Sequence, residues 1–145
     1  MYGVVQGRLS KSPDNQLQWF PQDCWQDEFC KCETLGLNFV ELLDERSYNS
    51  NNPIWSSSGR DEIKKVVSET NRIIYSSCTD NIIDNSLSLE TTLDHVFNYL
   101  EVSKYLGCEI AIFPLMEESS ITPNNFDSYV STIRELCNST SFTIC

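Results

Sequence analysis

The stretch Leu-Asn-Phe-Val-Glu-Leu (LNFVEL, residues 37–42) decides the fold, because similar short apolar runs recur along the chain. The others are YGVVQ, RIIYSSC, CEIAIF and SFTIC. The five runs begin 33 to 36 residues apart, at Tyr2, Leu37, Arg72, Cys108 and Ser141. Short apolar runs bounded by turn residues are typical of buried strands. The sequence therefore predicts five strands at an almost constant spacing.

Each interval between two of these strands contains a segment with helical periodicity. In the third interval Leu89, Leu93, Val96 and Leu100 are three or four residues apart, a spacing that places them on one helix face. The expected helix starts are Asp23 with Gln26, Ser58 with Asp61, and Thr122 with Pro123; the expected ends are Gly36, Asn71, Gly107 and Asn138. Alternation of strand and helix through four units indicates a parallel sheet.

Two α/β architectures fit this alternation, an open doubly wound sheet and a barrel. No GxGxxG motif follows the first strand, so a dinucleotide-binding fold lacks its phosphate turn. The long connections, residues 7–22 and 43–57, both follow strands, as on the functional face of a barrel. A complete barrel needs about 250 residues. We therefore expect an α/β fold of the parallel (β/α) TIM-barrel type, a partial barrel of four βα units plus a fifth strand, forming one domain over residues 1–145.

Composition argues against several classes of partner. The formal net charge is −11 and the pI is about 4.3, so the surface repels phosphate backbones and anionic membranes. We expect neither nucleic-acid nor membrane binding. The N-terminus shows no signal-peptide pattern, and the seven cysteines include no CxxC motif, which favours reduced thiols in a cytoplasmic protein. Cys30 and Cys32 are two apart on an expected helix, a spacing that does not suit a shared metal ion.

Polar residues follow the expected strands at their carboxyl ends, where parallel sheets bind ligands. The candidate binding residues are Gln6, Arg8, Glu41 and Asp80. Arg8 either holds a phosphate or carboxylate group or forms an ion pair with Glu41 or Asp80. Glu41 interrupts an apolar run, so it is either a functional group at the barrel mouth or a structural partner of Arg8. Asp80 precedes an asparagine and also suits a turn. We assign no catalytic residue and no metal ligand within this chain.

Two further features have a structural explanation that we favour over a functional one. Trp19 and Phe20 either wall a sugar-sized pocket or pin the first long loop to the core, and we favour the second. The only histidine, His95, falls inside the third expected helix. We interpret it as a helix-surface or interhelical residue rather than as a base or a metal ligand.

Several motifs together resemble the sugar phosphate isomerase/epimerase family, which has a xylose isomerase-like TIM barrel. They are GVVQGRLS (residues 3–10), LQWFPQDCWQDEF (17–29), LGLNFVELLDE (35–45), SSSGRDEIKKVVSET (56–70) and YLGCEIAIFPL (105–115). The resemblance covers nearly the whole chain, but only the amino-terminal half of the family's barrel. It implies that Gln6, Arg8, Glu41 and Asp80 line the sugar side of a substrate pocket.

The resemblance also implies a divalent metal (Mn, Mg, Co or Zn) in a full-length member, with ligands from strands five to eight. This chain ends at Cys145, within the fifth expected strand. We therefore expect the substrate-side half of an isomerase or epimerase of carbohydrate metabolism, inactive alone, that binds a sugar or sugar phosphate. The alternative is a non-catalytic half-barrel that binds a small ligand or a partner chain. Open sheet edges predict self-association in either case.

Overall fold

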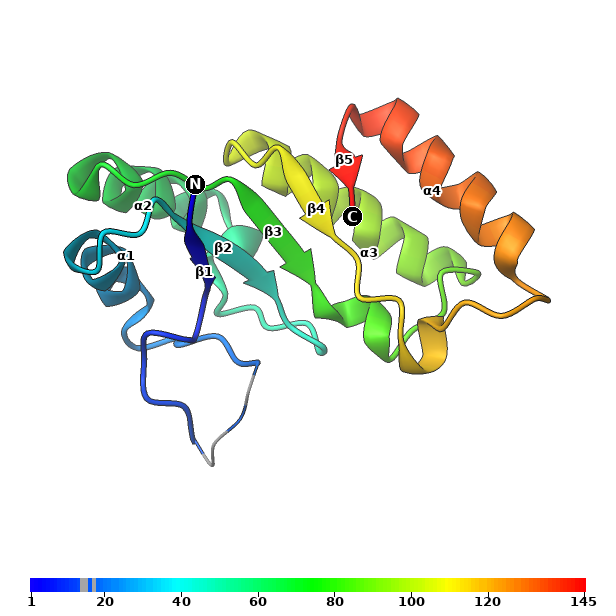
Figure 1. Cartoon of the computed structure of the whole chain (residues 1–145), viewed down its shortest axis with the longest axis horizontal. Helices are drawn as coiled ribbons and strands as arrows, with labels where there is room; N and C mark the ends of the chain where they lie inside the picture. The colour runs from blue at the N-terminus through cyan, green and yellow to red at the C-terminus, as the bar shows by residue number, and fades with distance from the viewer. Residues whose placement is uncertain (14–15, 17) are drawn as a thin grey trace.

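The chain forms a five-stranded parallel sheet whose strands lie side by side in sequence order, as its computed structural model shows (Figure 1). The structure describes residues 1–13, 16 and 18–145; part of the loop expected over residues 7–22, including Leu17 of the LQWF motif, lies outside them. The strands are β1 (Gly3–Val5), β2 (Phe39–Asp44), β3 (Ser76–Thr79), β4 (Ile110–Ile112) and β5 (Thr143–Ile144). The order β1-β2-β3-β4-β5 confirms the partial barrel and rules out the order 2-1-3-4-5 of a flavodoxin-like sheet.

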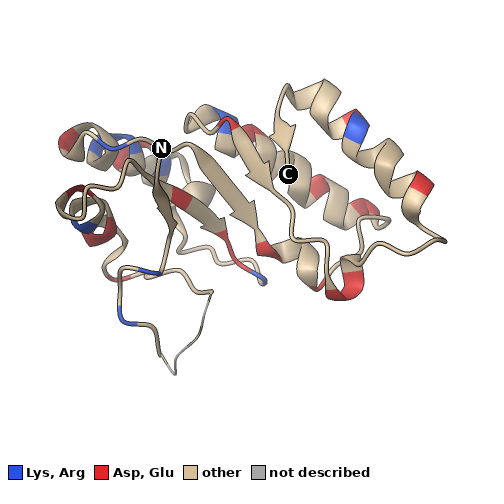
Figure 2. Ribbon diagram, viewed as in Figure 1, with Lys and Arg blue, Asp and Glu red and all other residues tan. Residues whose placement is uncertain are grey.

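Four helices connect the strands as the periodicity predicts. They are α1 (Trp25–Thr34), α2 (Ser57–Thr70), α3 (Glu90–Tyr105) and α4 (Phe126–Thr140). Three short 3-10 helices lie where strands lead into helices: η2 (Pro53–Trp55), η3 (Asp80–Ile83) and η4 (Glu117–Ser119). Acidic segments gather at this carboxyl end of the sheet, the lower end in Figure 2.

The expected helix starts are wrong, whereas three of the four expected ends are correct. The residues that precede the helices are Cys24, Ser56 and Asn125, not Asp23, Ser58 or Thr122, and of these three only Ser56 caps with its side chain, accepting from Gly59 N–H at 3.0 Å. The φ angles of Gly36, Asn71 and Gly107 are positive, as chain reversal at a helix end requires. The fourth helix continues past Asn138 to Thr140 and ends at Ser141 in the left-handed region.

The sheet has an outer face covered by helices and an inner face that none of the described helices covers. Ser77 marks the outer face, because its hydroxyl bonds Tyr99 at 2.7 Å and Ser103 at 3.0 Å, both in α3. Side chains alternate along a strand, so Ser76 and Cys78 belong to the inner face. In the register of β2 and β3, Leu43 lies beside Cys78 on that face.

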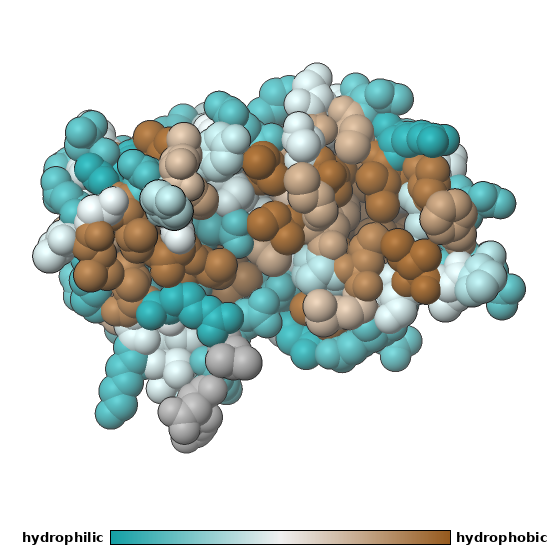
Figure 3. Space-filling view, in the orientation of Figure 1, coloured by the Kyte–Doolittle hydropathy of each residue, from teal (hydrophilic) through white to brown (hydrophobic). Residues whose placement is uncertain are grey.

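The hydrophobic core lies between the outer face and the helices. It includes Val40, Leu42 and Ala111 from the sheet and Phe29 and Leu100 from the helices, all buried. Each such side chain contributes about 1.5–3 kcal/mol through its burial. The inner face, nearest the viewer in Figures 1 and 3, also shows hydrophobic surface. Self-association through this face and the sheet edges stays a prediction.

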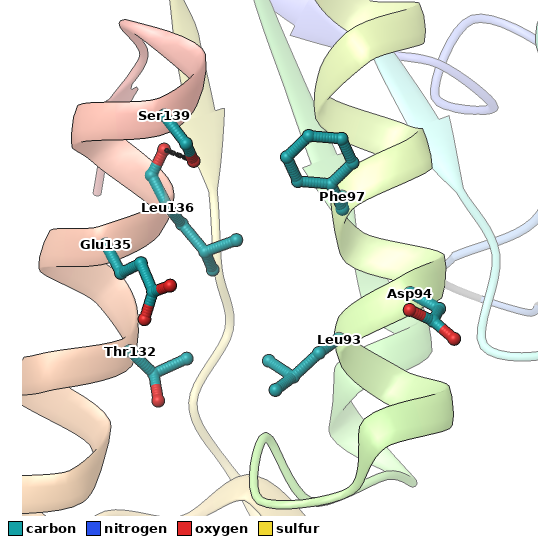
Figure 4. Close-up of a pocket in the computed structure, with 7 residues that line it drawn as sticks. All are labelled: Leu93, Asp94, Phe97, Thr132, Glu135, Leu136 and Ser139. Atoms are coloured by element: carbon teal, nitrogen blue, oxygen red, sulfur yellow. Dashed lines mark hydrogen bonds between the residues drawn. The ribbon is translucent and has the colours of Figure 1, made fainter.

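A groove of about 290 Å³ separates α3 from α4 on the outer layer. Leu93 and Phe97 of α3 point across it toward Leu136 of α4 (Figure 4). The two helices therefore leave Phe97 partly exposed. Among the described residues, no helix has both the length and the hydropathy that crossing a membrane requires.

Candidate functional site

Gln6, the first polar residue after β1, is built into the sheet. Its backbone N–H donates to Glu41 O at 2.9 Å, and its side-chain Oε1 accepts from Leu43 N–H at 3.3 Å. Both bonds continue the pairing of β1 with β2 beyond the end of the strand, and the residue is buried. That Gln6 contacts a substrate stays a prediction.

A buried carboxylate holds the turn that follows. Glu28 of α1 accepts from Gly7 N–H at 2.6 Å and from Leu9 N–H at 3.0 Å. The indole Nε1 of Trp19 donates to Gly7 O at 3.0 Å, and Phe20 is buried in the core. Trp19 and Phe20 therefore pin the loop, as we favoured. No motif in the sequence marks Glu28, because an acidic residue in the first turn of a helix is common.

Glu41 lies on the inner face of β2, where it accepts from Ser76 Oγ–H at 2.5 Å. Burial raises the pKa of the Glu41 carboxyl; the hydrogen bond from Ser76 opposes that increase, and the negative charge of Asp80 adds to it. The two carboxyl groups therefore lie close enough to influence each other. Glu41 lies within β2, three residues before its end, and Asp80 directly follows the neighbouring strand β3.

Asp80 is the first residue of η3 and is fully buried. Its Oδ1 accepts from Gln18 Nε2 and from the Cys78 thiol, each at 3.4 Å. Its Oδ2 is buried and has no hydrogen-bond partner among the described residues. Burial raises the pKa of Asp80, and the nearby guanidinium groups of Arg46 and Arg8 lower it by smaller amounts. An inward carboxyl with a spare oxygen is suited to a ligand hydroxyl.

Arg8 is exposed and forms no ion pair with any described acidic residue. Of the two alternatives for its guanidinium, the ion pair with Glu41 or Asp80 is therefore not formed. The positive charge of Arg8 nevertheless lowers the pKa of Asp80 slightly, so the guanidinium lies within electrostatic range of that carboxyl. Glu41 and Asp80 influence each other electrostatically, but Glu41 lies beside Ser76 within the sheet, whereas Asp80 follows the end of β3.

In Glu41→Gln and in Asp80→Asn, the free energy of unfolding is expected to decrease less steeply with rising pH than in the unmodified chain. Burial raises both pKa values above their ordinary values of 4.5 and 3.8, so the folded chain binds more protons than the unfolded chain above those values. The free energy of unfolding therefore decreases as pH rises through the folded-state pKa. Urea denaturation between pH 4.5 and 8 measures this slope, with exposed Glu33→Gln as the control. Unchanged slopes in both variants would contradict the burial argument.

Asp44 and His95 form a second cluster, which corrects the expectation that His95 lies on the helix surface or between helices. Instead, Asp44 lies beside Thr79 on the outer face, and His95 Nε2 of α3 contacts its Oδ2 at 2.7 Å. Thr79 Oγ–H donates to the same oxygen at 2.6 Å. His95 is an interior contact between helix and sheet. No motif spacing in the sequence indicates this pair.

The residues on the inner face do not make a metal site by themselves. Among residues 1–13, 16 and 18–145, no cluster of three or more His, Cys, Asp or Glu side chains is arranged to hold an ion. Glu41 and Asp80 provide two carboxyl groups, whereas Mg²⁺ takes six oxygen ligands, several of which can be water. One Glu41 oxygen is already bound by Ser76. The described residues of the inner face therefore do not complete a metal site.

Comparison with known proteins supports the fold. No family model and no curated protein matches the sequence. Among solved structures, the chain is similar to a xylose isomerase-like TIM barrel protein from Mycobacterium smegmatis in complex with magnesium, with a TM-score of 0.65 and 15% sequence identity. The chain has the fold of half a TIM barrel. The match covers 99% of this half-barrel and 53% of that chain, so the half-barrel spans about half the neighbour's length.

Proposed function

We propose that the inner carboxyl edge of the half-barrel binds a sugar or sugar phosphate, as the substrate-side half of an isomerase- or epimerase-like barrel. The observation that carries the proposal is the presence of two buried carboxyl groups on the inner side of the sheet, Glu41 within β2 and Asp80 directly after β3. The resemblance of the fold to a xylose isomerase-like barrel supports it.

The chemistry of the pair suits a polyhydroxylated ligand. Because burial raises both pKa values, a protonated carboxyl can donate to a sugar oxygen while an ionised one accepts from a sugar hydroxyl. Arg8 adds a guanidinium, whose paired N–H groups match a phosphate. Proton transfer between neighbouring carbons of a sugar needs such an acid and base.

Catalysis in a full barrel would also use a divalent ion (Mn, Mg, Co or Zn), and the neighbour was crystallised with magnesium. This half-barrel supplies two carboxyl groups and no further clustered ligand among its described residues. We therefore propose binding by this chain and expect no turnover from it alone. The second candidate is a non-catalytic half-barrel that binds a small ligand or a partner chain, which the uncovered inner face favours.

Arg8→Ala is expected to weaken binding of D-fructose 6-phosphate about tenfold, the effect of losing roughly 1.4 kcal/mol of phosphate contact. Binding of D-fructose should not change, because the guanidinium is assigned to the phosphate. Isothermal titration calorimetry with both sugars and with inorganic phosphate measures the difference. Lys11→Ala, another exposed cation of the same loop, is the matched control.

Three outcomes of this titration would overturn part of the proposal. Equal weakening by Lys11→Ala would assign the effect to general charge, and no binding of either sugar would overturn sugar recognition itself. Retention of D-fructose binding in Glu41→Gln combined with Asp80→Asn would remove the carboxyl pair from the site. An isomerase assay with added Mn²⁺ distinguishes the catalytic candidate from the non-catalytic one.

A further inference from the structure

A polar pocket of about 210 Å³ lies on the opposite side of η3 from the inner site. Asn81 and Asn85 line it from η3 and the following turn, and Thr91, Thr92 and His95 line it from the first turns of α3. Residues three and four apart share a helix face, so the two threonines and the histidine face the pocket together. Nothing in the proposed function uses these residues.

Asp44 fixes the orientation of the histidine in this pocket. His95 Nε2 lies 2.7 Å from Asp44 Oδ2, and an ionised carboxylate in this contact accepts a hydrogen bond from Nε2–H. His95 also lines the pocket. Trp55 packs against the imidazole with its ring centre 5.1 Å away, and only 18% of the His95 side chain is exposed. The imidazole is therefore held in one position before any ligand arrives.

The remaining lining residues present unused oxygen atoms. Asn81 Nδ2 donates to Arg46 O at 3.2 Å, and Asn85 Nδ2 donates to Asn81 O at 2.7 Å, so both amide groups are oriented. Neither side-chain oxygen has a partner among the described residues. Thr92 is only 4% exposed, yet its hydroxyl makes no hydrogen bond with any described residue. Its oxygen is not among the buried unpaired polar atoms of the described residues, so the hydroxyl is accessible from the pocket that Thr92 lines.

The charges around the pocket exclude most classes of ligand. No lysine or arginine lines it, and nearby Arg46 is bound by Asp84 and Glu117 at 2.5 and 2.6 Å, so an anion finds no counter-charge. His95 is the only strong metal ligand among the lining residues. Amide oxygens, hydroxyls and one imidazole nitrogen match the hydroxyl groups of a neutral ligand, since a hydroxyl both donates and accepts.

We propose that this pocket binds a small neutral polyol through Asn81, Asn85, Thr92 and His95. Its volume is below the roughly 300–1,000 Å³ of sites for drug-sized ligands, so the occupant is between glycerol and a monosaccharide in size. The site is separate from the inner one, because Asp80 faces inward while the next residue, Asn81, lines the outer pocket. It does not depend on the proposed isomerase-like function.

The test is a titration of ¹⁵N-labelled protein with glycerol, myo-inositol and D-xylose, followed by NMR and by fluorescence of Trp55. We expect saturable shifts at the Asn81 and Asn85 side-chain amides for at least one polyol, with a millimolar dissociation constant. Thr92→Val removes the free hydroxyl at nearly constant volume and should weaken binding about five- to tenfold, the value of one hydrogen bond. Thr132→Val on α4 is the control and should bind as the unmodified chain does.

Other outcomes are decisive against the outer site. Shifts confined to residues around Glu41 would support the inner site and overturn this one. Tighter binding of acetate or of Mn²⁺ than of any polyol would overturn the neutral-ligand assignment. Unchanged polyol affinity in both Thr92→Val and Asn85→Ala would show that polyols do not bind in this pocket. Loss of the NMR shifts in Thr92→Val, with sugar binding at the inner site unchanged, would support the outer pocket.

Discussion

Gly7→Ala is expected to lower the free energy of unfolding by roughly 2–4 kcal/mol. Gly7 has a φ of 90°, a backbone conformation that an alanine adopts only with strain. A Cβ atom at this position would also meet the backbone carbonyl of Trp19 well inside contact distance, with the indole ring close by. The loop would have to shift, and its hydrogen bond from Trp19 to Gly7 O would weaken.

Gly36→Ala separates these two causes. Gly36 has a φ of 70°, but no atom lies within 4 Å of the Cβ that alanine would add. It should lose only the conformational contribution, about 1–2 kcal/mol. Chemical denaturation of both variants measures the difference. Equal losses would mean that the loop accommodates the methyl group, contrary to the close contact described above.

Glu28→Ala is expected to lower the free energy of unfolding by about 2–4 kcal/mol, because two backbone N–H groups lose their acceptor. Those groups belong to Gly7, which is buried, and to Leu9, which is partly buried. Glu33→Ala is the matched control, since Glu33 is exposed on the same helix. Amide hydrogen exchange should show faster exchange at Gly7 and Leu9 in Glu28→Ala only. Unchanged exchange at both would contradict the role of Glu28 in holding the turn.

The strand order and helix number could be predicted because they depend on apolar periodicity, which is a local property of the sequence. The helix starts could not. Asp23 has the side chain of a good cap, but the helix begins after Cys24, which forms no side-chain cap. Ser56, Ser57 and Ser58 are equally good caps by residue type, and only the structure shows that Ser56 accepts from Gly59 N–H. Gly36 and Gly107 were predictable because positive φ angles have a strong residue preference.

The candidate site was predictable only in part. Glu41 and Asp80 could be singled out because each is an acidic residue within or directly after an apolar run, although Glu41 lies within β2 rather than at its end. Asp44 ends β2, and alternation from Glu41 places its side chain on the outer face. Its contact with His95 joins residues 51 apart in the sequence, and nothing local encodes such a pairing. Sugar contacts by Gln6, Arg8, Glu41 and Asp80 stay predictions until ligands are titrated.

The short helix η3 lies between the two proposed ligand sites, because Asp80 belongs to the inner one and Asn81 to the outer pocket. A ligand in either site would therefore contact the same turn of backbone. Where one ligand shifts this turn, it changes the affinity of the other site. By reciprocity, a polyol in the outer pocket should change sugar affinity at the inner edge by the same factor by which the sugar changes polyol affinity.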